Sequence, residues 1–177
     1  TPEQIGTDSN FVSVSAGYNF YAAIKADGTL WTWGANNYGQ LGRNDTTSWV
    51  ETPTQVGSSS DWKQVSCGTR HSLSLDSAGH LYFWGQYSWG ANSGTIQHTP
   101  IIYDPFLYQY VCAGNSTSAA IHINGSLWVW GFNYSGFLGF GDNYDRTVPT
   151  QIDADADWSK IYVGSTFFLG LKNDKTL

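Results

Sequence analysis

The sequence predicts an all-β protein, a β-propeller built from four-stranded antiparallel blades and present as an incomplete ring. A motif of leucine, an aromatic residue, any residue, tryptophan and glycine occurs at residues 30–34, 81–85 and 127–131. Four landmark glycines recur about every 50 residues, a period typical of propeller blades, at Gly17, Gly68, Gly114 and Gly164. Within one period the apolar residues alternate with period two and give no helical stripe. The chain therefore reads as about three and a half copies of one β-unit.

The first strand of a unit is expected at residues 11–16 and 62–67, and the second at residues 21–25 and 72–75. Asp27-Gly28 and Asn124-Gly125 follow second strands and supply the positive backbone angles that a tight hairpin needs. Asp174-Lys175 takes this place in the last unit. The expected blades cover residues 1–51, 52–98, 99–147 and, for the incomplete fourth, 148–177.

Two rows of apolar residues stand at fixed distances before the landmark glycines. The first row is Phe11, Trp62, Tyr108 and Trp158, and the second is Val14, Val65, Val111 and Ile161. A single sheet cannot bury both rows alone. Cover from a neighbouring sheet is therefore expected. Stacking of the units is therefore predicted to supply most of the stability.

The motifs resemble the regulator-of-chromosome-condensation repeat along essentially the whole chain. The resemblance rests on the segments 68–75, 79–85 and 37–42, which read GTRHSLSL, GHLYFWG and NYGQLG. Members of this family form seven-bladed propellers, so the resemblance implies half a ring. The remaining blades are expected from the same polypeptide or from a second chain.

Composition limits the possible partners. The net charge is −6 with only eight basic residues, which disfavours nucleic acid and acidic membrane surfaces. No apolar run is long enough to span a bilayer, so membrane insertion is not expected. Low charge and many Asn, Ser and Thr residues favour an extracellular or virion-surface location.

Catalytic, metal and cofactor sites are not predicted. Cys67 and Cys112 stand at alternate strand positions and are not expected to pair, and Cys67 occupies a small buried slot. His71 and Ser72 are adjacent strand residues that face opposite ways, so they do not make a nucleophile and base. The carboxylates of residues 153–157 imitate a calcium loop but lack its glycine and its terminal glutamate. We expect no enzyme, no cofactor and no metal.

Function is expected in the loops after the Trp-Gly motifs, where aromatic side chains alternate with amides. Such loops suit recognition of a protein or a glycan. The candidate binding residues are Asn37, Tyr38, Trp49, Tyr87, Trp89, Tyr134, Phe137 and Tyr144.

Two other functions compete with a binding module. Guanine-nucleotide exchange on a small GTPase is the activity that named the family, but the fold alone does not confer it. Light sensing occurs in an ultraviolet-B branch of the family, whose Gly-Trp-Arg-His motif carries the chromophore tryptophan. This sequence has Thr69 at that place.

Overall fold

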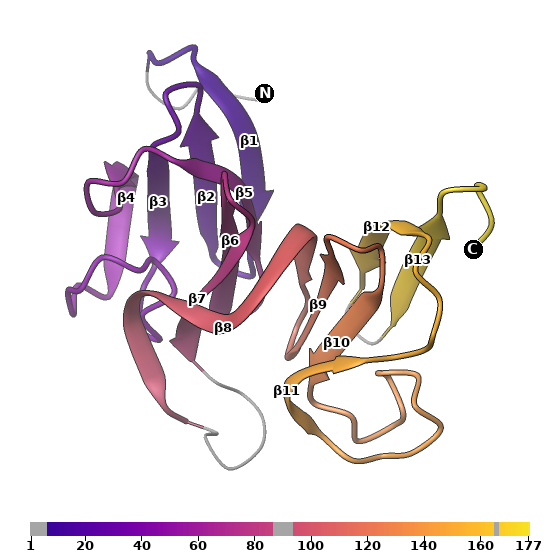
Figure 1. Cartoon of the computed structure of the whole chain (residues 1–177). Coiled ribbons are helices and arrows are strands. Elements are labelled where there is room, and N and C mark those ends of the chain that lie inside the picture. The colour runs from indigo at the N-terminus through magenta and orange to yellow at the C-terminus, as the bar shows by residue number, and fades with distance from the viewer. Residues whose placement is uncertain (1–6, 87–93, 165–166) are drawn as a thin grey trace, which may run out of the picture.

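The computed structural model describes residues 7–86, 94–164 and 167–177, which form a fan of antiparallel β-sheets (Figure 1). These residues contain no helix, and therefore none long and apolar enough to cross a membrane. The all-β prediction is confirmed.

The first blade is a four-stranded meander in which each strand pairs with the next one in sequence. Its order is β1 (Phe11–Ala16), β2 (Phe20–Lys25), β3 (Leu30–Ala35) and β4 (Trp49–Gln55). The first and second strands of the repeat thus lie where the alternating pattern predicts them.

Blades 2 and 3 form one seven-stranded sheet because they share a long, curved strand. That strand, β8 (Ile96–Ala113), pairs with β7 up to Leu107 and with β9 from Tyr108 onward (Figure 1). The other strands are β5 (Trp62–Cys67), β6 (His71–Asp76), β7 (His80–Gln86), β9 (Thr117–His122), β10 (Leu127–Gly131) and β11 (Arg146–Gln151). The fourth unit contributes a pair, β12 (Trp158–Val163) and β13 (Phe168–Lys172).

The outer strands extend beyond the blade boundaries predicted from the sequence. β4 continues to Gln55, and the part of β8 that pairs with β7 continues to Leu107. The outer strands alternate weakly and are mostly half-buried or exposed, so their sequence carries little signal of where they end. The exact unit boundaries stay a prediction.

The hairpins between second and third strands use one left-handed residue each. Gly28 has φ 78° and Gly125 has φ 89°, while Lys175 takes the same place with φ 72°. In the first hairpin the Gly28 amide donates to the Lys25 carbonyl at 2.9 Å, and the Lys25 amide donates to the Thr29 carbonyl at 3.0 Å. The loop therefore has three residues, with the positive angle in its last residue, rather than two residues that both have positive angles.

Packing between blades buries the second apolar row. Val65, Val111 and Ile161 are 5%, 0% and 0% exposed, and each lies in a cluster with residues of the blade that precedes its own. Val14 has the same repeat position but belongs to the first blade, and it is 74% exposed. The same kind of residue is therefore buried only where a neighbouring blade covers it.

The tryptophan of the Trp-Gly motif follows the same rule. Trp84 and Trp130 are fully buried, and the indole N–H of Trp84 donates to the Gln40 carbonyl of blade 1 at 2.8 Å. Trp33, in the first blade, is half-buried and stacks on Tyr21 with ring centroids 5.4 Å apart.

The landmark glycines allow successive inner strands to approach closely. A Cβ on Gly17 would lie 2.5 Å from the Gly68 carbonyl oxygen, and one on Gly68 would lie 2.4 Å from the Gly114 carbonyl oxygen. Serine hydroxyls join the same strands, since Ser15 Oγ accepts from the Cys67 amide and Ser66 Oγ from the Ala113 amide, both at 2.9 Å. Gly17, Gly68 and Gly114 are thus required by the blade that follows each of them, whereas a Cβ on Gly164 would meet only Phe167 of its own unit.

We predict that Gly34→Ala lowers the free energy of unfolding more than Gly57→Ala. Both glycines have positive φ, 103° and 59°, so both substitutions carry a backbone cost, which is about 1–2 kcal/mol for the left-handed angle of Gly57. Only at Gly34 would the added Cβ also meet backbone, 2.6 Å from the Asn19 oxygen, whereas Gly57 has open space. Chemical denaturation of the two variants measures the difference; equal losses would show that the Trp-Gly step is not sterically constrained.

Candidate functional site

One end of the sheets carries the turns after the inner strands and the loops after the Trp-Gly motifs. We call this end the loop face, and it comprises residues 17–19, 36–48, 68–70, 114–116 and 132–145. It forms because β1 and β3 run in the same direction, so that the turn after β1 and the loop after β3 leave the same edge. The opposite end carries the hairpins between second and third strands.

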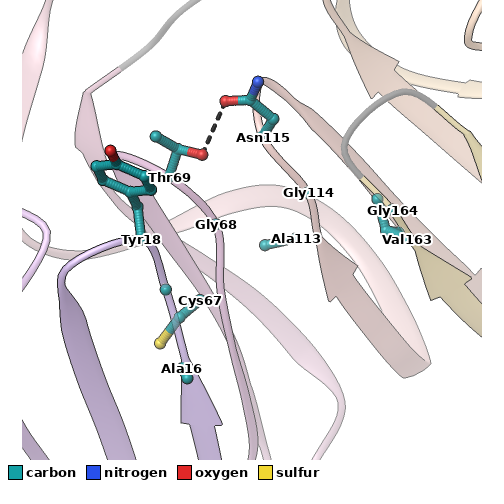
Figure 2. A pocket seen from close by; sticks show the side chains of 11 residues that line it. Ala16, Tyr18, Cys67, Gly68, Thr69, Ala113, Gly114, Asn115, Val163 and Gly164 are labelled. Carbon is teal, nitrogen blue, oxygen red and sulfur yellow. Dashed lines mark hydrogen bonds between the residues drawn. The ribbon is translucent and has the colours of Figure 1, made fainter.

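A cavity of about 470 Å³ opens where the inner strands of the four units converge. Small residues and the landmark glycines form most of its wall, and the side chains of Tyr18, Thr69 and Asn115 stand at its rim (Figure 2). The Thr69 hydroxyl donates to the Asn115 side-chain oxygen at 2.8 Å and joins the turns of blades 2 and 3. The lining carries no charged side chain among the described residues, so the cavity suits an uncharged surface.

Asn37 and Tyr38 lie together at a second cavity of about 250 Å³, between blades 1 and 2. Asn37 is exposed, whereas Tyr38 is half-buried under the Arg70 guanidinium, which lies 4.4 Å from the ring centroid. Tyr18 borders both this cavity and the central one. The two cavities therefore form neighbouring parts of one surface.

The other predicted binding residues are dispersed. Tyr134 and Tyr144 are 74% and 75% exposed on the loop between β10 and β11. Phe137 is half-buried and lines a separate cleft of about 320 Å³ beside Phe167 and Phe168.

The expectation that Trp49 lies in a loop is wrong. Trp49 is the first residue of β4, paired with Ala35, although its side chain is 56% exposed. Tyr87 and Trp89 lie outside the described residues.

Two asparagines of the loops that follow the Trp-Gly motifs, Asn36 and Asn133, are buried structural residues. Asn36 accepts from the Leu41 amide at 3.1 Å and donates to Asp45 Oδ1 at 3.0 Å. Asn133 is fully buried, accepts from the Leu138 amide at 2.8 Å, and donates to carbonyl and carboxylate oxygens of the same loop. Both asparagines hold their loops in one shape.

Sequence reasoning missed Tyr18, which is 76% exposed on the loop face. The signal was available, because the residue after each landmark glycine starts the turn that shares an edge with the Trp-Gly loops. Phe132 was also missed; it is 38% exposed and stacks on Tyr134 with ring centroids 6.1 Å apart.

Burial makes the two reactive side chains near the cavity unsuited to catalysis. Cys67 lines the central cavity, and burial raises the pKa of its thiol to about 12, so it is not a thiolate at neutral pH. Burial lowers the pKa of His71 to about 4, and its Nε2 lies 3.0 Å from Ser118 Oγ of blade 3. His71 joins two blades as a neutral ring, while the Ser72 hydroxyl donates to the Gln40 carbonyl of blade 1.

Stacked meanders of this size, with loops gathered at one end, define a part of a β-propeller. Comparison with family models agrees: a model of the regulator of chromosome condensation (RCC1) repeat matches residues 27–75 and 124–171, and a second model of this repeat matches residues 11–40. The chain belongs to the RCC1 repeat family.

Individual relatives support this membership. The ultraviolet-B receptor UVR8 of Arabidopsis thaliana is 32% identical over 85% of this chain and 36% of its own length. Human WBSCR16 matches 97% of this chain with a TM-score of 0.86 and 25% identity, and yeast RCC1 (Prp20) bound to Kap60 matches 94% with a TM-score of 0.75 and 24% identity. The chain covers 48% and 44% of those two solved chains, so it spans less than half of each relative.

We predict that His71→Phe reduces the loss of stability in acid. Since the folded pKa is about 4 and the ordinary value is 6.5, the unfolded chain binds more protons between these values. The stabilisation from neutral His71 is complete above about pH 6.5 and falls by about 2–3 kcal/mol as the pH drops to about 4.5. Phenylalanine occupies the equivalent place at Phe20 and does not titrate.

Denaturation midpoints at neutral and acidic pH measure this effect. The His122→Phe variant serves as the matched control, because His122 is half-buried on β9. Equal acid sensitivity in wild type and His71→Phe would show that burial of His71 does not govern the response.

Proposed function

We propose that the chain is a non-enzymatic protein-binding module whose loop face contacts the partner. The observation that carries this proposal is the set of exposed aromatic side chains on that face, Tyr18, Tyr134 and Tyr144. Tyrosine offers a large contact area with few rotatable bonds, and it is enriched in binding surfaces. The loop that presents Tyr134 and Tyr144 is held by the buried Asn133, so little conformational entropy would be lost on binding.

Relatives give this proposal its partner class. Yeast RCC1 (Prp20) has been solved bound to Kap60, and Prp20p of Saccharomyces cerevisiae has binding properties toward Gsp1p and histones. These partners are proteins. The weakly charged rim around Tyr18, Thr69 and Asn115 supports a partner surface that is itself weakly charged.

A glycan is the alternative ligand, since tyrosine and asparagine also suit sugar recognition. An extracellular or virion-surface location remains an expectation from the composition.

We also infer that the exposed Val14 face of blade 1 meets a further blade, from the same polypeptide or from a second chain, because the equivalent valines of blades 2 and 3 are buried.

Guanine-nucleotide exchange is the second candidate, supported by the structural similarity to yeast RCC1. Release of a fluorescent guanine nucleotide from a panel of small GTPases tests it. Acceleration by the wild-type chain that is lost in the loop-face variant below would favour exchange over simple binding.

We predict that Tyr18→Ser/Tyr134→Ser reduces partner capture without loss of stability. Both side chains are mostly exposed, so their removal should leave the denaturation midpoint near that of wild type. Quantitative affinity capture compares this variant with Ile123→Ser, whose exposed side chain lies in a hairpin at the opposite end. Proteins bound by wild type and Ile123→Ser should be depleted at least about tenfold with the double variant.

The reverse pattern, loss with Ile123→Ser and retention with the double variant, would place the interface at the opposite end. A glycan array probed with the same three proteins separates the two ligand classes. Sugar binding that depends on Tyr18 and Tyr134, without any captured protein, would favour the glycan.

A further inference from the structure

A cleft of about 370 Å³ lies between blades 1 and 2, outside the loop-face cavities described above. It is bordered by the middle of the β3–β4 loop, which is part of the loop face, by the connector from β4 to β5 and by residues of β5, β7 and β8. Its apolar wall consists of Val56, Trp62, Tyr82 and Pro100, and its polar wall includes Arg43 and Ser58. This volume falls within the range of small-molecule sites.

Two hydrogen-bond donors at this cleft lack an acceptor within the described part of the chain. Trp62 is 8% exposed, and its buried indole Nε1 has no partner there. Arg43 pairs with Asp45 through Nη2 at 3.0 Å, but its buried Nη1 also has no partner there. A buried donor without an acceptor costs about 1–3 kcal/mol, so an acceptor supplied by a ligand would be favoured.

The equivalent positions in the next two units show what kind of acceptor fits. The Tyr108 hydroxyl donates to Asp104 Oδ2 at 2.7 Å, and the Trp158 indole lies 3.5 Å from Asp153 Oδ1. Asp104 lies four residues before Tyr108 within β8, and Asp153 lies five residues before Trp158 in the connector from β11 to β12. In blade 2 the matching connector residues are Ser58 and Gly57, so the carboxylate is missing where the cleft is found.

We propose that this cleft binds an organic carboxylate carried on a small apolar body. The ligand's carboxylate takes the place that Asp104 and Asp153 occupy in the other units, where it accepts from Trp62 Nε1 and Arg43 Nη1. Its apolar part packs on Tyr82 and Pro100. The Tyr82 ring already stands edge-on to Trp62, with centroids 4.8 Å apart, and the two rings form a wall for a third.

Two acidic groups limit which orientation is possible. Asp61 and Asp76 both interact electrostatically with Tyr82, and Asp76 is paired with His80 at 2.7 Å. A ligand carboxylate near Tyr82 would meet repulsion from these groups. On the Arg43 side Asp45 already occupies Nη2, which leaves Nη1 as the donor for a ligand. The Nη1 side of Arg43 is therefore the place for the charge, and the Tyr82 side is the place for the apolar body.

Indole proton signals in a ¹H–¹⁵N spectrum test the proposal directly. Trp62→Phe identifies the Trp62 signal by its loss. Titration with phenylacetate should shift this signal downfield and saturate, while the uncharged 2-phenylethanol should bind at least about tenfold more weakly. N-acetylphenylalanine serves as the second acid, and tighter binding of either acid tells whether a free small acid or the carboxyl end of a peptide is preferred.

Three variants provide the matched controls. Arg43→Gln should weaken phenylacetate binding at least about tenfold. Ser58→Asp restores the carboxylate at the place of Asp104, so it should abolish binding and shift the Trp62 signal without ligand. Asn173→Asp adds the same charge at an exposed position outside the loop face and should bind as wild type does.

The proposal is overturned if neither acid moves the Trp62 signal at tens of millimolar in a natively folded chain. It is also overturned if the acids and 2-phenylethanol bind equally, or if Ser58→Asp binds the acids as wild type does. Each of these results is independent of partner capture by the loop face.

Discussion

Burial of apolar side chains between successive blades is the interaction on which the rest of the structure depends. Val65, Val111 and Ile161 are buried by the blade before them, whereas Val14 at the same repeat position is exposed. Trp84 and Trp130 differ from Trp33 in the same way. A sheet in this chain therefore completes its core only by contact with a neighbour, as expected of a repeat architecture.

The sites follow from that packing. Close approach of inner strands at Gly17 and Gly68 brings the turns of successive blades around one cavity, where Tyr18 and Thr69 form part of the rim. Side chains of types that often act in catalysis are used here for polar contacts between blades. His71, for example, is buried and neutral and contacts Ser118 of blade 3. The cleft proposed to bind a carboxylate lies between blades 1 and 2. This interface lacks the internal carboxylate acceptor that Asp104 and Asp153 provide in the next two units.

Repeat register made much of the fold predictable. It placed β1, β5, the hairpin glycines and the sterically constrained Trp-Gly step, because these features recur with local sequence signals. It did not show that β8 runs through two blades, since outer strands have weak alternation. The structural roles of Asn36 and Asn133 could not be predicted either. In the sequence, an asparagine whose side chain hydrogen-bonds within its loop cannot be told from an asparagine exposed to solvent. Burial of Trp84 but not Trp33 depends on neighbours that no local pattern records.

The most direct test of packing between blades compares Trp84→Ala with Trp33→Ala. The two residues share one repeat position, but only Trp84 is covered by another blade. Urea denaturation followed by circular dichroism should show a loss of about 3–5 kcal/mol for Trp84→Ala and a clearly smaller loss for Trp33→Ala. Equal losses would contradict the account, because they would mean that the tryptophan stabilises its own sheet and not the contact between sheets.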